Sequence, residues 1–284
     1  MCLLLPATAR PIERFEARMA ASKWQVSATR LVCRLSHTIP RYGKAEFVQR
    51  SGQGGLTFVL HTARPLLHKV SAVLSAEPPV WKHGALVRQL GTVDLSAGAR
   101  VMQLNEGRAR ELLKELEAGM FPTLSYSGAG DASAPAIGRD GDVRIALSAV
   151  NFRAALQDFL DCRRQLVAYD FKAVRESVLH FAHDSANLDE SARDRLAKVA
   201  LFARVDQRLE QLSVRGFADA RGTRRYNRGL SRRRALTVKH YLVKHGVAAD
   251  KVRVSYFGEK HSVETNVTPA GRAANRRVVV ILHQ

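Results

Sequence analysis

The residue types best suited to binding chemistry lie in the C-terminal half, where a single carboxylate precedes a group of arginines. Gly216-Phe-Ala-Asp219 leads into a short loop, and Ser231-Arg-Arg-Arg234-Ala follows. Ser231 is a favourable N-cap, so a helix beginning there would place residues 232–234 in its first turn. Cations are disfavoured there by roughly 0.3–1 kcal/mol each, which predicts an anion bound by the arginines and by backbone N–H groups. With Asp219 as acceptor for an ammonium, the sequence predicts a site for a zwitterion such as an amino acid head group.

Helices and strands alternate around this segment. Apolar residues recur at helical spacing over 188–203, after the favourable N-cap Asp189, and again over 235–242, before the C-cap glycine Gly246. Strands are predicted at 212–216, 252–256 and 278–282, the last a continuous apolar run typical of an interior strand. The C-terminal half is therefore predicted to be a βαβ-type sandwich of helices on one mixed sheet.

The N-terminal half contains short alternating runs bounded by Gly, Pro and Ser. Strands are predicted at 31–35, 56–61, 70–75, 87–93 and 143–147. One helix is predicted over 108–118, with Gly119 as its stop, and 127–141 is predicted to be a loop between two strands. This half is expected to be β-rich and barrel-like, so the chain as a whole is placed in the α+β class.

Three separated motifs give the C-terminal half a family resemblance. The Asp219-x-x-Gly loop, Tyr226-Asn-Arg-Gly-Leu-Ser with Arg234-Ala, and Asn275-Arg-Arg-Val occur in the order and spacing of the OmpA-like peptidoglycan-binding domain. The resemblance extends from near Val174 to Leu282. It implies that Asp219 accepts the ammonium of diaminopimelate in the stem peptide. It also implies that Arg234 grips a ligand carboxylate bidentately, which a lysine cannot do.

The alternative to ligand binding is that Asp219 is an ordinary turn aspartate that bonds its own backbone. Asn227 and Leu230 match family positions that shape the loop, and Leu230 is expected to pack in the core. Arg276 or Arg277 either closes the site or forms a structural ion pair. Ala218 stands where the family usually has threonine, which removes a hydrogen bond worth about 0.5–1.5 kcal/mol and predicts weaker wall binding.

The neighbouring Arg232 and Arg233 match variable family positions. They are expected to form a solvated basic face or to touch sugar or phosphate groups.

Further motifs extend the resemblance over nearly the whole chain after about Trp24. The segments 31–47, 117–126 and 143–152 resemble the MotY family of flagellar motor proteins. This implies a periplasmic protein that joins a ring on the basal body, meets a MotX-like partner or stator proteins, and helps to hold stator units. The implied domains are a docking domain over 10–168 and a peptidoglycan-binding domain over 169–284.

The N-terminus and the cysteines fit export, which this resemblance implies. Ala7-Thr-Ala9 has the small-x-small form of a cleavage site, so 1–9 is interpreted as the remnant of a signal peptide, with a frayed terminus as the alternative. Loss of Cys2 would leave Cys33 and Cys162. They are expected to form a disulfide in an oxidising compartment, the alternative being two buried thiols.

Composition excludes several other classes. No apolar run is long enough to span a membrane. The net charge of +19 suggests a polyanion partner, but aromatic residues are few and no zinc spacing occurs, so nucleic acid is not expected. No metal spacing or carboxylate pair points to an enzyme or a cofactor. The predicted function is a non-catalytic flagellar motor protein. The alternatives are an OmpA/Pal-like envelope tether unrelated to motility, a nucleic-acid binder and a wall hydrolase.

Overall fold

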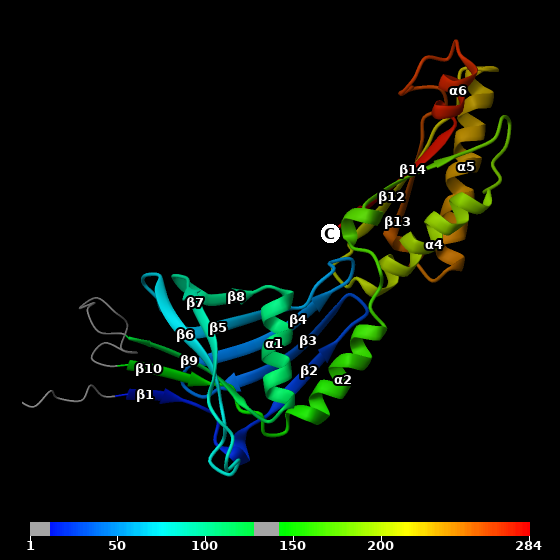
Figure 1. Cartoon of the computed structure of the whole chain (residues 1–284). Helices are drawn as coiled ribbons and strands as arrows, with labels where there is room; N and C mark the ends of the chain where they lie inside the picture. The colour runs from blue at the N-terminus through cyan, green and yellow to red at the C-terminus, as the bar shows by residue number, and fades with distance from the viewer. Residues whose placement is uncertain (1–11, 128–141) are drawn as a thin grey trace, which may run out of the picture. The chain divides into compact units, whose positions relative to one another are not determined.

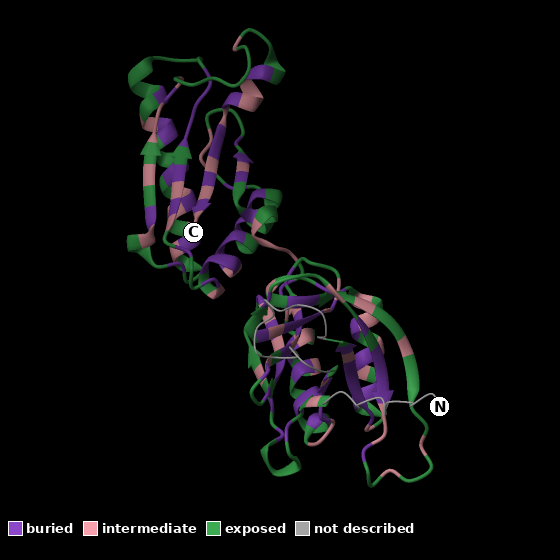
Figure 2. Cartoon of the chain, turned by 90° about the vertical axis from the view of Figure 1, so that its left-hand side faces the viewer, coloured by how far each residue is buried: buried purple, intermediate pink, exposed green. Residues whose placement is uncertain are grey.

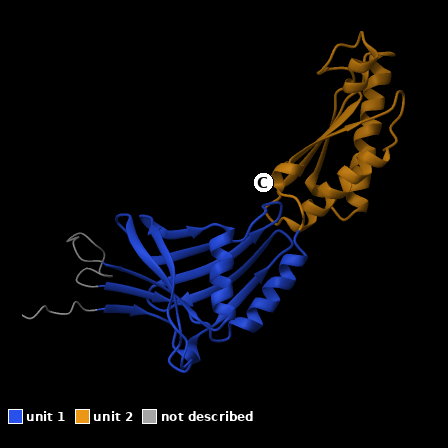
Figure 3. Ribbon diagram, viewed as in Figure 1, with its two compact units in different colours: residues 1–166 blue, residues 167–284 orange. Residues whose placement is uncertain are grey.

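The computed structural model describes residues 12–127 and 142–284, and the chain divides into two compact units after Leu166. We call them the N-terminal unit and the C-terminal unit (Figure 3). The interpretation of residues 1–9 as a signal remnant lies outside the described residues, as does nearly all of the loop predicted over 127–141. Within the described part of the chain, no helix is both long enough and apolar enough to cross a membrane.

Two five-stranded sheets form the N-terminal unit (Figure 1). The first is antiparallel throughout, in the order β2 (Trp24–Ala28), β3 (Val32–Ile39), β4 (Gly43–Arg50), β5 (Thr57–Leu66) and β8 (Gly98–Leu104). The second runs β1 (Ile12–Phe15), β10 (Asp142–Ala146), β9 (Phe121–Ser127), β6 (Val70–Glu77) and β7 (Arg88–Leu95), with only β1 and β10 parallel. The predicted strands are confirmed. The described strands do not close into a barrel, so the barrel-like arrangement predicted from the sequence was wrong.

Helices cover these sheets and complete one apolar core. The short 3-10 helix η1 (Met19–Ala21) precedes β2, α1 (Glu106–Glu117) packs on β5 and β9, and α2 (Phe152–Arg164) packs on β2 and β3. The core joins aromatic and aliphatic side chains of both sheets with the inner faces of both helices. The predicted disulfide is present: Cys33 of β3 is bonded to Cys162 of α2, with Cα atoms 6.0 Å apart. It therefore ties a strand to the helix that covers it.

The C-terminal unit is a four-stranded mixed sheet with helices, as predicted. In chain order its elements are α3 (Phe171–Val174), β11 (Glu176–His180), α4 (Glu190–Val205), β12 (Gln211–Gly216), α5 (Arg224–Lys244), η2 (Ala249–Lys251), β13 (Val252–Tyr256), α6 (Pro269–Asn275) and β14 (Arg277–His283). The strand order is β11-β14-β12-β13, and only β12 and β13 are parallel. The apolar run 278–282 therefore lies in an interior strand, as its composition indicated.

Local sequence explains where these elements begin, end and touch. Asp189 caps α4 by accepting a hydrogen bond of 2.7 Å from the backbone N–H of Ala192, and Gly246, with φ of 86°, follows the end of α5. Along β12, buried residues alternate with more exposed ones. Figure 2 shows that buried, intermediate and exposed residues are mixed along the strands and helices of the chain. Gly216 ends that strand, and a Cβ there would lie 2.2 Å from the carbonyl oxygen of Ser231. Glycine is needed here because α5 approaches β12 so closely.

Helix α5 begins earlier than the sequence predicted. Its N-cap is Thr223, whose hydroxyl accepts from the backbone N–H of Tyr226 at 3.3 Å. Ser231 lies inside the helix, where its hydroxyl donates to the Arg228 carbonyl and accepts from the Gly258 N–H, both at 3.0 Å. The prediction that Ser231 caps a helix was therefore wrong, and residues 232–234 do not lie in a first turn.

Candidate functional site

A cavity of about 220 Å³ lies in the C-terminal unit, beside the loop that joins β12 to α5. Its lining residues are His183, Asp184, Asp219, Arg221, Gly222, Tyr226, Leu230, Arg234 and Arg276. Three elements therefore meet there: the loop after β11, the first half of α5 with its preceding loop, and the residue before β14. The carboxylate and the guanidinium that the sequence singled out share this one cavity.

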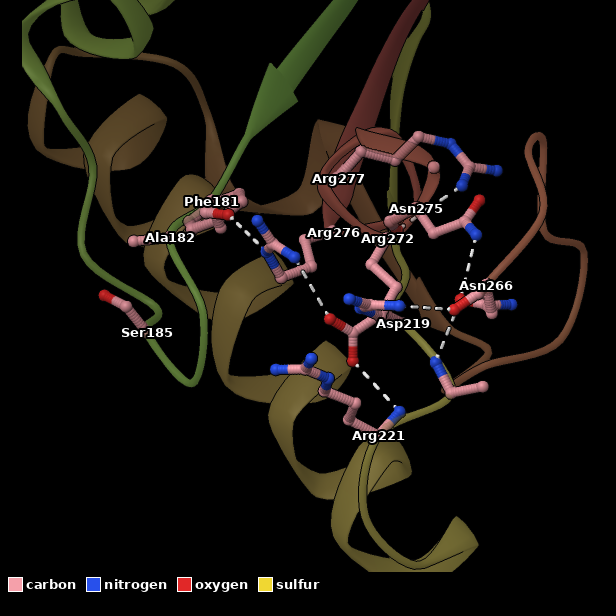
Figure 4. Close-up of polar contacts among 12 residues, drawn as sticks. Phe181, Ala182, Ser185, Asp219, Arg221, Asn266, Arg272, Asn275, Arg276 and Arg277 are labelled. Carbon is pink, nitrogen blue, oxygen red and sulfur yellow. Dashed lines mark hydrogen bonds and ion pairs between the residues drawn. The ribbon is translucent and has the colours of Figure 1, made fainter. Parts of the chain in front are cut away.

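Asp219 lies in the loop after β12 and is almost fully buried. Its Oδ1 accepts a hydrogen bond from the backbone N–H of Arg221, and its Oδ2 forms an ion pair with Nη1 of Arg276, both at 3.2 Å (Figure 4). Asp219 therefore bonds its own backbone, as the alternative for this residue predicted, and it is also the acidic partner in the structural ion pair that was the alternative for Arg276. Each carboxylate oxygen accepts up to two hydrogen bonds, so neither contact exhausts the carboxylate.

Arg234 is fully buried and reaches the cavity from the middle of α5. It donates to three backbone carbonyls: Nε to Ser185 at 2.7 Å, Nη1 to Phe217 at 3.1 Å and Nη2 to Ala182 at 3.1 Å. A guanidinium has five N–H donors, so one on each terminal nitrogen is not used by these three bonds. Burial lowers the pKa of Arg234 to about 10, and the charge of Asp219 opposes this shift, so the side chain stays cationic at neutral pH.

The two arginines of the Asn-Arg-Arg motif have different roles. Arg276 lines the cavity, pairs with Asp219 and donates through Nε to the Phe181 carbonyl at 3.0 Å. Arg277 is buried outside the cavity lining, where its guanidinium lies 4.1 Å from the centre of the Phe217 ring and Nη2 donates to the His261 carbonyl at 2.9 Å. The structure therefore places Arg276, and not Arg277, at the cavity.

Asn275 fixes the loop that faces the Asp219 segment. It is fully buried, and its Oδ1 accepts from the N–H of Val263 at 2.9 Å while its Nδ2 donates to Oδ1 of Asn266 at 3.0 Å. The same Asn266 oxygen accepts from the backbone N–H of Ala220 at 3.1 Å (Figure 4). The asparagine of the motif is thus linked to the residue after Asp219 through a single intervening side chain.

The remaining candidates frame the cavity. Leu230 is a buried residue that also contributes to the cavity lining. Asn227 is buried outside the lining and donates through Nδ2 to Oε2 of Glu259 at 2.7 Å. Ala218 is buried as well, and its backbone N–H donates to the Gly258 carbonyl at 2.7 Å.

Sequence reasoning assigned no role to five of the lining residues: His183, Asp184, Arg221, Gly222 and Tyr226. Asp184 and His183 follow β11, far along the chain from the Asp219 loop, and no spacing pattern connects them to it. Tyr226 belongs to a motif that was recognised, but no role was assigned to it. Its hydroxyl donates a hydrogen bond to the Asp184 carboxylate. The cavity therefore holds a second carboxylate, which spacing along the chain could not have indicated.

The chemistry of this arrangement is that of binding. A carboxylate, a second carboxylate and a buried guanidinium surround a small space, which suits a ligand that carries both an ammonium and a carboxylate. Over residues 12–127 and 142–284, no group of three or more His, Cys, Asp or Glu side chains could hold a metal ion.

Comparisons with known proteins agree with both units. A family model described as the MotY N-terminal domain matches residues 15–168, and the OmpA family model matches 180–276. The sodium-type flagellar protein MotY of Vibrio parahaemolyticus is 30% identical over 95% of this chain and 90% of its own length. A peptidoglycan-associated lipoprotein of Brucella melitensis is 33% identical over 37% of this chain and 62% of its own length. Among solved structures, the C-terminal domain of Helicobacter pylori MotB matches 38% of this chain and 84% of its own, with 21% identity and a TM-score of 0.35.

Proposed function

Because this chain belongs to the MotY family of flagellar motor proteins, we propose that it anchors to peptidoglycan through the cavity around Asp219 and Arg234. Its relatives are motor and wall-associated proteins rather than enzymes, and the proposed role is likewise structural. The observation that carries the proposal is that a buried carboxylate and a buried guanidinium line the same cavity. The burial of either group alone would be explained by its hydrogen bonds within the fold.

The proposed ligand is diaminopimelate of the stem peptide, whose free end carries an ammonium and a carboxylate on one carbon. The ammonium donates to Asp219, and the carboxylate accepts from the N–H groups of Arg234 that the three carbonyls leave unused. Arg276 is a positioning residue: through its 3.2 Å ion pair and its bond to the Phe181 carbonyl it orients the Asp219 carboxylate. The buried site reduces competition from water, which strengthens each contact.

The N-terminal unit is proposed to dock on the flagellar basal body, so that 10–168 form the docking domain and 169–284 the wall-binding domain. A MotX-like partner or stator proteins would contact it there, and the ring so formed would help to recruit or hold stator units. A periplasmic location is supported by the Cys33–Cys162 disulfide, since such bonds persist in oxidising compartments. The role is mechanical: reaction force passes from the stator to the wall.

The tethering alternative is disfavoured by the extent of the resemblance. The peptidoglycan-associated lipoprotein matches only part of this chain, whereas the motor protein of Vibrio parahaemolyticus matches both units. A deletion strain distinguishes the two ideas. We expect it to lose swimming and to lack ring density on isolated basal bodies, and normal swimming would favour a tether unrelated to motility.

Competition with soluble muropeptides tests the wall-binding site. The full chain should sediment with purified sacculi, and a muropeptide containing diaminopimelate should displace it. The matched control is a muropeptide with lysine at the same position, which keeps the ammonium but lacks the side-chain carboxylate that Arg234 would bind. We expect the lysine form to compete much less well. Equal competition by both forms would contradict the role of Arg234.

A further inference from the structure

The loop that joins β6 to β7 in the N-terminal unit carries a cluster of exposed apolar side chains (Figure 1). Val80 and Leu86 are 87% and 81% exposed, and Trp81 and Val87 are 47% and 52% exposed. No other part of the described chain exposes as many large apolar side chains within eight residues. Single exposed apolar residues are ordinary on a protein surface, whereas a cluster of them marks an interaction site. We call residues 78–87 the apolar loop.

Polar contacts hold the apolar loop in one position. Lys82 donates to the carbonyl of Ala118, the C-cap residue of α1, where the helix dipole favours a cation. Arg88, the first residue of β7, forms an ion pair with the buried Glu115 of α1. The backbone N–H of Lys82 also donates to the Pro79 carbonyl at 2.9 Å and closes a turn. Because these contacts fix the loop before a partner arrives, little conformational entropy is lost when it binds one.

A hollow of about 270 Å³ lies beside the apolar loop. Its lining combines residues 78–81 of the loop with the last residue of β6 and with residues of β9, β10 and the end of β1. The ring of Trp81 meets the ring of Phe121 edge-on, with 5.9 Å between the ring centres. A cavity of about 150 Å³ is large enough to bind benzene, so this hollow has room for one large side chain of a partner.

The charged residues of the hollow balance one another. Arg14 and Arg144 line it together with Glu16 and Glu77, and Glu77 forms an ion pair with Arg144. Two arginines and two glutamates leave no net charge that would attract an ion of either sign. An uncharged aromatic or aliphatic side chain is therefore the better occupant, and Trp81 provides an aromatic wall for it.

We propose that the apolar loop and the hollow form the surface by which the N-terminal unit docks on a protein of the flagellar basal body, and that this protein inserts one large uncharged side chain beside Trp81. The inference rests on the proposed docking function and assigns it a surface. Tryptophan is among the residues that most often dominate the binding energy of an interface. The nearly fully exposed Val80 and Leu86 add apolar area around it and would exclude water from the contact.

Two other occupants fit this surface less well. A lipid bilayer would require the four ionisable groups of the hollow to leave water together with the apolar loop, which is costly. A second copy of the chain would bring the same net charge of +19, and this excess opposes self-association.

The test removes apolar side chains from the loop and, as a matched control, from other exposed positions. The loop variant is Val80→Ser with Leu86→Ser, and a second variant is Trp81→Ala. The control variant is Leu67→Ser with Leu236→Ser, because both leucines are exposed and lie outside the apolar loop, the hollow and the cavity. The full chain is added to basal bodies isolated from a deletion strain, and the bound fraction is measured by co-sedimentation. Affinity for a soluble diaminopimelate muropeptide is measured beside it.

We expect the loop variant to bind basal bodies at least about tenfold more weakly, since both side chains would be buried in the contact. Trp81→Ala should weaken binding about 30-fold, as expected for a residue that dominates an interface. The control variant should bind as the wild type does. All variants should keep wild-type affinity for the muropeptide, because the cavity lies in the other unit. The loop variant should also keep the wild-type thermal stability, because Val80 and Leu86 lie outside the core.

Several outcomes would overturn the inference. Wild-type binding of basal bodies by both the loop variant and Trp81→Ala would do so, as would an equal loss in the control variant. Binding of the wild type to vesicles of phosphatidylglycerol and phosphatidylethanolamine that the loop variant lost would identify a membrane as the occupant instead. Self-association of the wild type that the loop variant lost, measured by sedimentation equilibrium, would identify a second copy. If the wild type itself failed to bind basal bodies, the proposed docking function would be wrong, whereas binding that all variants retained would reject only this surface.

Discussion

The ion pair between Asp219 and Arg276 allows the ligand role of the carboxylate to be separated from its role in the fold. Asp219→Asn and Arg276→Gln remove the same 3.2 Å contact. The first variant also removes the negative charge of residue 219, whereas the second keeps it. Asparagine retains an oxygen that can accept the hydrogen bond from the Arg221 N–H, so the loop itself is preserved. The two variants should therefore differ in binding more than in stability.

The expected sizes follow from the contacts. A hydrogen bond to a charged group contributes about 1.5–3 kcal/mol, so loss of the ligand ammonium contact should raise Kd about 10- to 150-fold in Asp219→Asn. Arg276→Gln should change Kd only about threefold, because the carboxylate remains but is less well oriented. Both should lower the free energy of unfolding by about 1.5–3 kcal/mol, since each breaks one buried charged contact.

Calorimetric titration with a soluble diaminopimelate muropeptide, beside urea unfolding of the same variants, measures both quantities. Asp250→Asn serves as a control, because Asp250 is an exposed carboxylate in η2 outside the cavity. If the two site variants lost equal affinity, Asp219 would act through the fold alone. Unchanged affinity in Asp219→Asn would refute the cavity as the binding site.

Three further predictions concern the fold. Replacing Cys33 and Cys162 by serine should lower stability by up to about 4–5 kcal/mol, because the bond closes a loop of 129 residues; urea unfolding with and without reductant checks this, and an unchanged midpoint would contradict it. Burial lowers the pKa of His37, so the folded chain binds a proton less readily than the unfolded chain. Stability should therefore be full above about pH 6.5 and fall as the pH drops below that value, and His37→Phe should remove this component of the pH dependence of the unfolding midpoint. Gly216→Ala should cost about 1–3 kcal/mol, because its Cβ would meet the Ser231 carbonyl, and wild-type thermal stability would show that α5 can move away.

Periodicity and local signals were sufficient for most of the secondary structure. Asp189 and Gly246 mark helix ends because capping depends on the side chain or backbone freedom of a single residue. The interior position of the strand at 278–282 followed from its continuous apolar run. Such features depend on residues close together in sequence, so one chain is enough to recognise them.

Features that depend on pairing across the chain were not accessible in this way. Alternating strands indicate a β-rich unit, but whether its two sheets close into a barrel depends on which edges pair. The contribution of Asp184 to the cavity likewise depends on how β11 lies beside β14, which brings the loop after β11 next to Arg276. Neither the pairing of the sheet edges nor the position of Asp184 can be predicted from the spacing of residues along the chain.

The sequence argument for Arg234 as an anion-binding residue rested on a wrong premise about the helix. The sequence argument placed it in a first turn, where the helix dipole would require an anion, but α5 begins at Arg224 and Arg234 lies well inside it. What stabilises the buried cation is instead a set of three carbonyl oxygens, two from the loop after β11 and one from Phe217, just after β12. Those carbonyls fix the guanidinium in place before any ligand arrives, and they leave two of its five N–H donors unused. A guanidinium fixed in this way loses little side-chain entropy when it binds a carboxylate, so the observed geometry supports the anion site more directly than the dipole argument did.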